Sequence, residues 1–341
     1  MSILQKDKLE IKLLATTPER FRGDLAELGK HFSITPMPRH LQYKAYRPYL
    51  HGLLGLYLKQ FDALLCPSLW YKQDIPWGVV AKKAGVPSIV LQQDVLLPSH
   101  NAAIRKTHVI NKVTEFWPDL LITHNDISRD IITNRFPDSA DKIKKSGIPR
   151  MESLWREIGK SNTITVFSFQ TWWDEEGNTF QSVEENELWK SMNQTMAGLS
   201  ATYPEIQVII KHKWQATADR AKAILSYVPD NCDFTSKGNS IDLISRSKVV
   251  VGYCSATMLE SYYLGKPTII LDYGMPPGMR PFENDYIFPI RVKNEHHLII
   301  EIMKHIRVVN KTTYRKYFGE YPPAVSCAQA IKKFLVKNKS W

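Results

Sequence analysis

The residues best suited to chemistry lie where short apolar runs end. The β-branched run 249–251 stops at Gly252, and Ser255 and Thr257 then stand where a helix would begin. Such a run predicts a strand buried on both faces. A helix that begins beyond it presents free backbone N–H groups and its positive dipole end to an anion. The two hydroxyls either bind that anion or only cap the helix.

The segment that follows completes a strand, turn, helix, strand unit. Ala256 opens the predicted helix and belongs with Ser255 and Thr257 to the turn expected to bind the nucleotide, and Glu260, one turn further on, is placed to hydrogen-bond a ribose diol. Gly265 stands where a C-cap glycine is expected, and the run 268–271 predicts the next strand.

A second group with chemical potential follows the apolar run 207–211. Lys211, His212 and Lys213 place three cationic or donor side chains at a strand exit. In an open α/β sheet, ligands bind outside the carboxyl ends of the strands. These side chains and the Ser255 turn therefore predict one anion site at the same edge of a sheet.

An acid follows a strand in the first half of the chain. Asp94 comes directly after the run 88–91 and two glutamines. A carboxylate at a strand exit can act as general base toward a hydroxyl, or it can cap a turn or the next helix. His100 and Asp24 are the weaker candidates for the same role.

The elements that position these residues form two series of alternating strands and helices. In the first series the expected strands are 11–15, 33–37, 62–66, 88–91 and 119–123, and the expected helices are 17–32, 46–60, 77–84 and one through 131–132. The series restarts with a strand at 163–169 and a long helix near 184–202. Alternation of this kind predicts parallel βαβ units in a doubly wound sheet. We expect an N-terminal Rossmann-like domain at 1–157, a second at 160–320 and a C-terminal helix at 321–341.

Composition narrows the classes of protein. The 341 residues are 43% hydrophobic and 23% charged, which is typical of a globular protein of two domains. We expect no transmembrane helix and no signal peptide. Four scattered cysteines indicate reduced thiols and a cytoplasmic location. The net charge of +11 suits nucleic acid, a polyanionic acceptor, a nucleotide-sugar or a membrane surface. No nucleic-acid-binding motif appears, so we expect no nucleic acid partner.

The sequence lacks the motifs of several classes of enzyme. The sequence has no HExxH, no Cys or His ligand spacing, no GxSxG and no Walker A pattern. We therefore expect neither a metal nor another cofactor.

The segment 247–271, SKVVVGYCSATMLESYYLGKPTIIL, resembles the nucleotide-binding core of glycosyltransferases with the GT-B fold. The same motif recurs in UDP-sugar 2-epimerases, which share that fold. The likeness covers the C-terminal half and, more loosely, the whole chain. It implies an α/β protein of two Rossmann-like domains whose parallel sheets face a central cleft, with catalysis that needs no metal.

Further positions gain a role from this resemblance. Residues 211–213 are similar to the "KHP" element that binds nucleotide phosphate in Kdo transferases and teichoic-acid glycerophosphotransferases, with Lys213 in place of proline. Ser168 and Gln170 would lie near the nucleotide-sugar. Residues 146–150 resemble a "GNPR" turn in which Ile148 replaces asparagine, so Arg150 is a donor contact or part of a structural turn.

The resemblance to the transferases of 3-deoxy-octulosonate (Kdo) in capsule and O-antigen synthesis implies a glycosyltransferase. Its expected reaction transfers a sugar from a nucleotide-sugar, with CMP-Kdo or a related acidic sugar as the best candidate, to a bacterial surface glycan. The acceptor would be a glycan or lipid-linked glycan. The basic helix at 321–341 docks on the N-terminal domain or also makes a peripheral contact with the inner membrane. Two alternatives stay open: a UDP-sugar 2-epimerase on the same fold, or a non-catalytic protein that binds nucleotides or polyanions.

Overall fold

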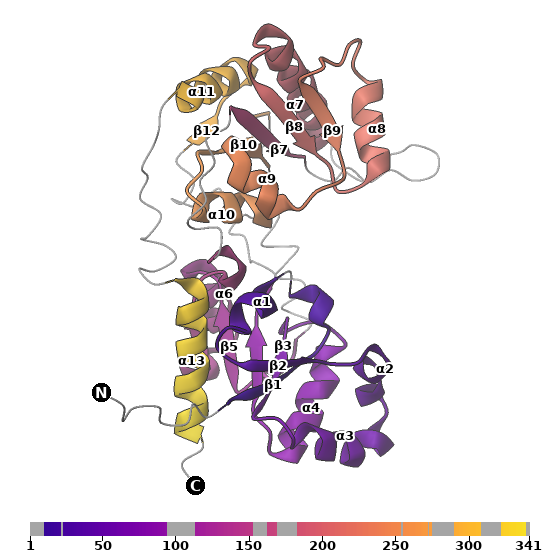
Figure 1. Ribbon diagram of the computed structural model, residues 1–341, viewed down its shortest axis with the longest axis vertical. Coiled ribbons are helices and arrows are strands. Elements are labelled where there is room, and N and C mark those ends of the chain that lie inside the picture. Colours follow the sequence, from indigo (N-terminus) through magenta and orange to yellow (C-terminus); the bar gives the residue numbers. More distant parts are fainter. Residues whose placement is uncertain are drawn as a thin grey trace, which may run out of the picture. The chain divides into compact units, whose positions relative to one another are not determined.

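The chain folds into two compact units, each built on one parallel sheet (Figure 1). The computed structural model describes residues 10–21, 23–93, 113–152, 162–168, 183–253, 255–271, 273–274, 290–307 and 322–338. The first unit contains the described residues up to 152 together with the C-terminal helix, and the second contains those from 162 to 307.

The first unit has six parallel strands in the order β2-β1-β3-β4-β5-β6. The strands are β1 (Lys12–Ala15), β2 (Ser33–Pro36), β3 (Ala63–Cys66), β4 (Ser88–Leu91), β5 (Leu120–Thr123) and β6 (Ile143–Lys145). The helices are α1 (Asp24–Leu28), α2 (Arg39–Gln42), α3 (His51–Leu58), α4 (Asp74–Ala84), α6 (Asp126–Arg135) and α13 (Pro323–Asn338), with short 3-10 turns at Pro18–Arg20, Lys44–Tyr46, Pro48–Leu50, Pro137–Lys142 and Pro149–Met151.

Both faces of this sheet are buried, which explains the unbroken apolar runs of its strands. Leu14, Leu64 and Val90 belong to one core cluster, and their neighbours along the strands belong to another. Side chains alternate between the two faces of a strand, so each strand supplies both cores. The result is a doubly wound layer of helix, sheet and helix.

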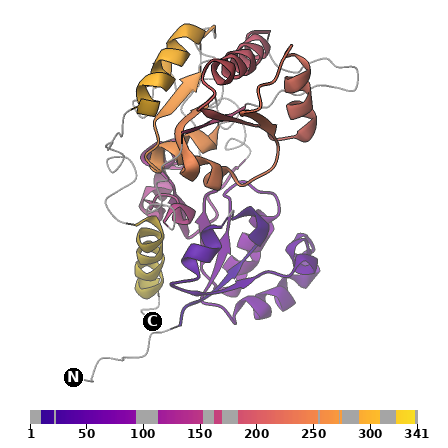
Figure 2. The same ribbon diagram turned by 45° about the horizontal axis from the view of Figure 1, so that its top comes forward.

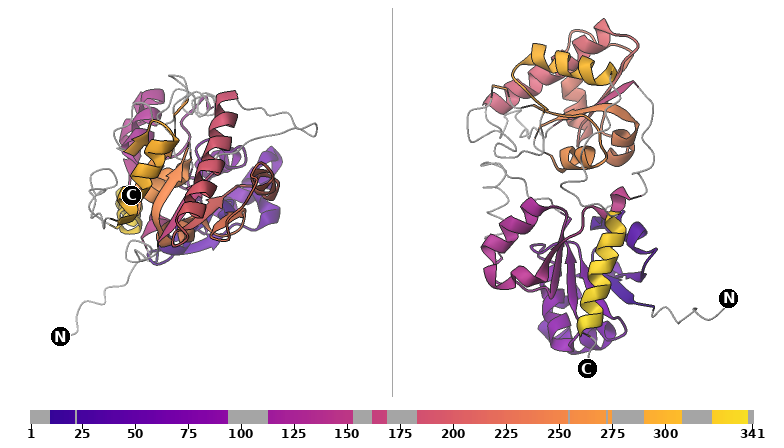
Figure 3. Two further views of the ribbon diagram at one scale, coloured as in Figure 1. Left: turned by 90° about the horizontal axis from the view of Figure 1, so that it is seen from above. Right: turned by 90° about the vertical axis from the view of Figure 1, so that its left-hand side faces the viewer.

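The C-terminal helix α13 lies on the first unit. Its face formed by Cys327, Ile331 and Leu335 is buried in the same core cluster as β1 and β4, and Figure 3 shows α13 running along the strands. The Glu152 carboxylate accepts hydrogen bonds from the backbone amides of Ala324, at 2.7 Å, and Val325, at 3.2 Å. A carboxylate at this position satisfies the free amides and favours the helix dipole.

No helix among the described ranges is long and apolar enough to cross a membrane.

The second unit repeats the architecture with the order β12-β11-β10-β7-β8-β9. Its strands are β7 (Thr163–Phe167), β8 (Gln207–Lys211), β9 (Cys232–Thr235), β10 (Ser247–Gly252), β11 (Thr268–Leu271) and β12 (Ile290–Val292). Its helices are α7 (Val183–Thr202), α8 (Gln215–Ala223), α9 (Ser240–Arg246), α10 (Ala256–Tyr263) and α11 (Glu295–Arg307). Helices α7 and α11 pack on one face of the sheet, and α9 and α10 pack on the other (Figure 2).

Two expected helices of the first unit are shorter than predicted. The helix expected at 17–32 is a 3-10 turn followed by α1, because Gly23, which lies between them, adopts a left-handed backbone with φ 99°. The helix expected at 46–60 begins only at His51, because Pro48 starts a separate 3-10 turn before it. Proline cannot continue an α-helix in its interior.

Candidate functional site

The second unit has a topological switch between β7 and β10. From β7 the chain proceeds to β8 and β9 on one side, and then returns to β10, β11 and β12 on the other. Phe167 pairs with both Lys211 and Gly252, so β7, β8 and β10 end at the same level. Such a switch at the carboxyl edge is where open α/β sheets bind ligands.

The turn from β10 into α10 is tight. A Cβ atom on Gly252 would lie 2.6 Å from Met258 Sδ and 3.2 Å from the Phe167 carbonyl oxygen, so the position requires glycine unless Met258 moves. This close fit brings the first turn of α10 up to the end of β7. The amides of that turn are the donors that the helix itself does not use.

Ser255 caps α10. Its Oγ accepts a hydrogen bond from the Thr257 amide at 3.3 Å and lies 2.7 Å from Thr257 Oγ1. The two hydroxyls predicted to meet an anion are therefore paired with each other at the helix start. Ala256 is the first residue of α10. The structure therefore shows the capping role of Ser255. An anion that bound here would form hydrogen bonds with the same two hydroxyls.

His212 is the central residue of the site. Its side chain is 1% exposed, and neither ring nitrogen has a hydrogen-bond partner among the described residues. The ring stacks on Phe234 at 6.1 Å between centroids and meets Trp189 edge to face at 6.3 Å. A buried polar group without a partner is rare and calls for an explanation such as a missing ligand.

The His212 ring is neutral at physiological pH. Burial, aided by the charge of Lys211, lowers the pKa of His212 to about 4. A neutral imidazole offers one N–H donor and one acceptor. Of the two roles expected for His212, cation or hydrogen-bond donor, the structure favours the donor.

The two lysines beside His212 are directed elsewhere. The Lys211 ammonium donates to the backbone carbonyls of Ser236 and of His212, the latter at 3.2 Å, and burial lowers the pKa of Lys211. Lys213 is exposed and lies 5.1 Å from the centre of the Trp214 ring. Lys211 thus ties β8 to the loop after β9.

Ser168 leaves β7 next to His212. Its amide donates to the Lys211 carbonyl at 3.0 Å, and its Oγ accepts from Trp189 Nε1 at 3.1 Å. Trp189 therefore contacts two predicted site residues at once. Gln170, Asp94 and His100 lie outside the described residues.

Three residues that line the candidate site, Trp189, Phe234 and Met258, carry no functional signal in the sequence. Trp189 lies on the buried face of α7 and Phe234 on β9, so each appeared to be an ordinary core residue. The apolar side chains of these residues indicate only that they are buried, and they do not indicate a place beside His212.

Two charged residues in and just after α10 are buried. Glu260, predicted to reach a ribose, is 3% exposed. Lys266 is 4% exposed, and its ammonium donates to the carbonyls of Ser245 and Ser247, each at 2.7 Å. Burial lowers the pKa of Lys266 to about 8. The lysine of the "LGKP" motif thus joins the end of α9 to the start of β10, a structural role.

Arg150 belongs to a buried ion pair in the first unit. Its Nη1 lies 2.8 Å from Asp24 Oδ2 and 3.4 Å from Gln93 Oε1, and its amide donates to Asp24 Oδ1 at 2.8 Å. Burial raises the pKa of Asp24, and the Arg150 charge opposes that rise. The pair fixes the 3-10 turn at Pro149–Met151 against α1, and this favours the structural alternative for Arg150.

The first unit holds a buried acid that the sequence analysis did not single out. Asp74, the first residue of α4, is fully buried, and its Oδ1 accepts from Thr16 Oγ1 at 2.8 Å and Thr17 Oγ1 at 3.4 Å. Its Oδ2 has no partner in the described part of the chain. Burial raises the pKa of Asp74 to about 7. The left-handed backbone of Thr17 aims its hydroxyl at this carboxyl group.

Within the described ranges, no three His, Cys, Asp or Glu side chains come together as a metal site.

Comparison with known proteins gives the fold. No family model and no curated protein match the chain. Among solved structures, the UDP-GlcNAc 2-epimerase from Neisseria meningitidis bound to UDP-GlcNAc is similar at TM-score 0.58 and 15% identity, over 96% of this chain and 99% of that one. The UDP-N-acetylglucosamine 2-epimerase from Rickettsia bellii gives 0.59 and 14%, over 96% of each chain. HepE from Anabaena, in complex with UDP and glucose, gives 0.57 and 13%, over 96% and 100%.

These likenesses cover nearly the whole chain and show that it has the GT-B-type fold expected from the sequence.

Because His212 is buried, we expect its imidazole to titrate at a lower pH than an exposed histidine. We expect the imidazole resonances of His212 to stay constant from about pH 8 down to about pH 5 and to shift only near the lowered pKa of about 4. Two-dimensional NMR of the histidine side chains measures this, with His212→Ala to assign the signal and exposed His296 as an internal reference. A midpoint near the ordinary value of 6.5 would contradict the buried, unpartnered placement.

The raised pKa of Asp74 predicts a pH-dependent contribution to stability. The folded state holds the proton up to about pH 7, whereas the unfolded chain releases it near 3.8. The favourable contribution is thus complete below 3.8 and is lost as the pH rises through 7. The loss is on the order of 4 kcal/mol. The lowered pKa of His212 changes the free energy of unfolding with pH in the opposite direction. The contribution of Asp74 is therefore taken as the difference in free energy of unfolding between wild type and Asp74→Asn.

Urea unfolding at several pH values measures that difference. We expect wild type to lose stability relative to Asp74→Asn between about pH 4 and about pH 7. A difference that does not change with pH would show that Asp74 titrates normally.

Proposed function

We propose that the chain is a sugar-nucleotide enzyme that binds a UDP-sugar at the carboxyl edge of its second sheet and inverts carbon 2 of the sugar. The observation that carries this proposal is His212, a buried donor without a partner among the described residues, which follows β8 at the same edge of the sheet as the start of α10. It occurs in a fold shared over nearly the whole chain with UDP-GlcNAc 2-epimerases. This is the epimerase alternative of the sequence analysis.

The proposed site binds the nucleotide diphosphate without a metal. The first-turn amides of α10 and its dipole favour an anion, and the hydroxyls of Ser255 and Thr257 add hydrogen bonds. The neutral His212 ring donates its N–H to a phosphate oxygen and so gains the partner that it lacks. An oriented donor in a dry site strengthens as charge develops on a departing oxygen.

Inversion at carbon 2 removes its proton while the bond from carbon 1 to the UDP oxygen breaks, and the electrons of the carbon–hydrogen bond form a carbon 1–carbon 2 double bond. A proton then adds to the opposite face of carbon 2, and the bond from carbon 1 to the UDP oxygen forms again. A base must accept the first proton, and an acid must deliver the second. We keep Asp94 as the proposed acceptor of the first proton, on the sequence argument alone. Because the proton exchanges with the solvent, epimerisation in D2O labels carbon 2 with deuterium.

The test is incubation of the full chain with UDP-GlcNAc in D2O, followed by NMR. We expect a second UDP-sugar that differs at carbon 2 and carries deuterium there. His212→Ala and Ser255→Ala should each weaken UDP affinity by about 1–3 kcal/mol, the loss of a charge-assisted or buried hydrogen bond. Calorimetry measures this, with His296→Ala as the exposed-histidine control.

The same experiment distinguishes the transferase that the sequence analysis placed first. Release of nucleotide only when a glycan acceptor is added, with no deuterium at carbon 2, would contradict the epimerase proposal. Binding of CMP in place of UDP would support a transferase that uses a CMP-linked acidic sugar as its donor. Failure to bind any nucleotide would overturn both enzyme proposals.

A further inference from the structure

An apolar surface lies on the first unit, outside the candidate site. The segment 39–59 joins β2 to β3 and contains α2 and α3. Five large apolar or aromatic side chains point outward from it, and we call them the α2–α3 face: Tyr43 (65% exposed), Tyr46 (49%), Tyr49 (74%), Leu53 (68%) and Leu56 (65%).

The α2–α3 face belongs to a well-packed segment. Ala45, Leu54 and Leu58 are buried in the core of the first unit. Trp77 Nε1 donates to the Gln42 carbonyl at 2.9 Å, and a Cβ atom on Gly55 would lie 3.3 Å from Ala84 Cβ, so α3 and α4 are in close contact. In Figure 1, α3 lies against α4 at the lower end of the first unit. The outward apolar side chains are thus held in place by an equally apolar inner side.

Leu53 and Leu56 lie three residues apart on α3, so they share one face of the helix. Isolated exposed apolar residues are common, but five large ones within residues 43–56 favour an interaction site. Because α3 is apolar on both sides, its outer side needs a partner that offers apolar contact.

The charge around the α2–α3 face has one sign. From Leu28 to Phe61 the sequence contains no Asp and no Glu, while Arg39, Lys44, Arg47 and Lys59 lie within the segment. A symmetric dimer would place this surface against its own copy. Like charges would then face each other at a cost. The charge therefore favours an anionic partner over a second copy of the chain.

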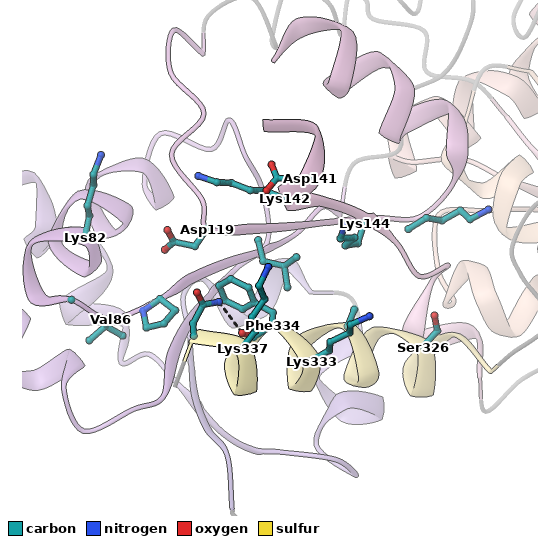
Figure 4. Close-up of a pocket in the computed structure, with 16 residues that line it drawn as sticks. Lys82, Val86, Asp119, Asp141, Lys142, Lys144, Ser326, Lys333, Phe334 and Lys337 are labelled. Atoms are coloured by element: carbon teal, nitrogen blue, oxygen red, sulfur yellow. Dashed lines mark hydrogen bonds between the residues drawn. The ribbon is translucent and has the colours of Figure 1, made fainter. Parts of the chain in front are cut away.

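A basic groove adjoins the C-terminal end of α4. It has a volume of about 1030 Å³ and is bounded by α4, β6 and α13. Six lysines line it (Figure 4): Lys82, Lys142, Lys144, Lys145, Lys333 and Lys337. Of its two acids, Asp119 already accepts hydrogen bonds from the Ser88 amide and hydroxyl, at 2.9 and 3.0 Å. Two of the six lysines are in ion pairs, Lys82 with Glu115 at 3.7 Å and Lys145 with Asp126 at 2.5 Å. Lys82 lies in the last turn of α4, two residues from Ala84, which adjoins Gly55 of α3.

We propose that the α2–α3 face binds the surface of an anionic phospholipid bilayer. Tyrosine is enriched at the membrane–water interface, where its ring is buried and its hydroxyl stays in water. Leu53 and Leu56 enter the boundary of the acyl chains, and Arg47 and Lys59 contact lipid phosphates. The lysines of the groove add attraction to the same negatively charged surface.

The test measures binding of the full chain to phosphatidylcholine vesicles made with or without phosphatidylglycerol. Wild type should float with the anionic vesicles, bind the neutral ones far more weakly, and be released by high salt. Leu53→Gln/Leu56→Gln should lower the partition coefficient by roughly 10²-fold, the combined effect of two leucines that no longer enter the bilayer. Arg47→Gln/Lys59→Gln should lower binding by roughly tenfold and weaken its salt dependence.

A matched variant controls for the loss of exposed apolar surface. Val183→Gln/Ile300→Gln removes two exposed apolar side chains from the second unit, where Val183 is 75% and Ile300 47% exposed. It should bind vesicles like wild type. None of the changed side chains is buried, so we expect every variant to remain folded. Thermal melting checks this.

Two outcomes would overturn the proposal. Wild type that stays in solution with both kinds of vesicle excludes a lipid surface. A concentration-dependent dimer of wild type that Leu53→Gln/Leu56→Gln dissociates, without vesicle binding, would assign the α2–α3 face to a second copy instead.

Discussion

A strand that is buried on both faces leaves polar side chains room only at its ends. All strands of the two sheets are parallel, so their carboxyl ends meet at one edge of each sheet. In the second unit Phe167 pairs with Lys211 and with Gly252, so β7, β8 and β10 end at the same level. The site that we propose at the switch between β7 and β10 rests on that register and on the few polar residues just beyond it.

His212 shows what this constraint does to a single residue. Stacked on Phe234 and against Trp189, the ring is dry, neutral and without a partner among the described residues. The cost of burying such a group is recovered when a ligand supplies the missing hydrogen bond. The start of α10 lies at the same edge and favours an anion. A nucleotide phosphate meets both requirements.

The sequence predicted the elements well because their signals are local. The β-branched run before Gly252 and the glycine after α10 lie next to the elements that they define, whereas the environment of a side chain depends on distant segments. Trp189 and Phe234 reach His212 from other elements, and Arg150 finds Asp24 across 126 positions of sequence. Local patterns also missed the left-handed backbone of Thr17, whose hydroxyl donates to the distant Asp74.

The central claim is that the second unit binds a nucleotide diphosphate through His212 and the start of α10. A crystal structure of the full chain with UDP tests it most directly. The account predicts a phosphate oxygen within hydrogen-bond distance of a His212 ring nitrogen and of the first-turn amides of α10. A nucleotide bound elsewhere, with His212 still unpartnered and buried, would contradict it.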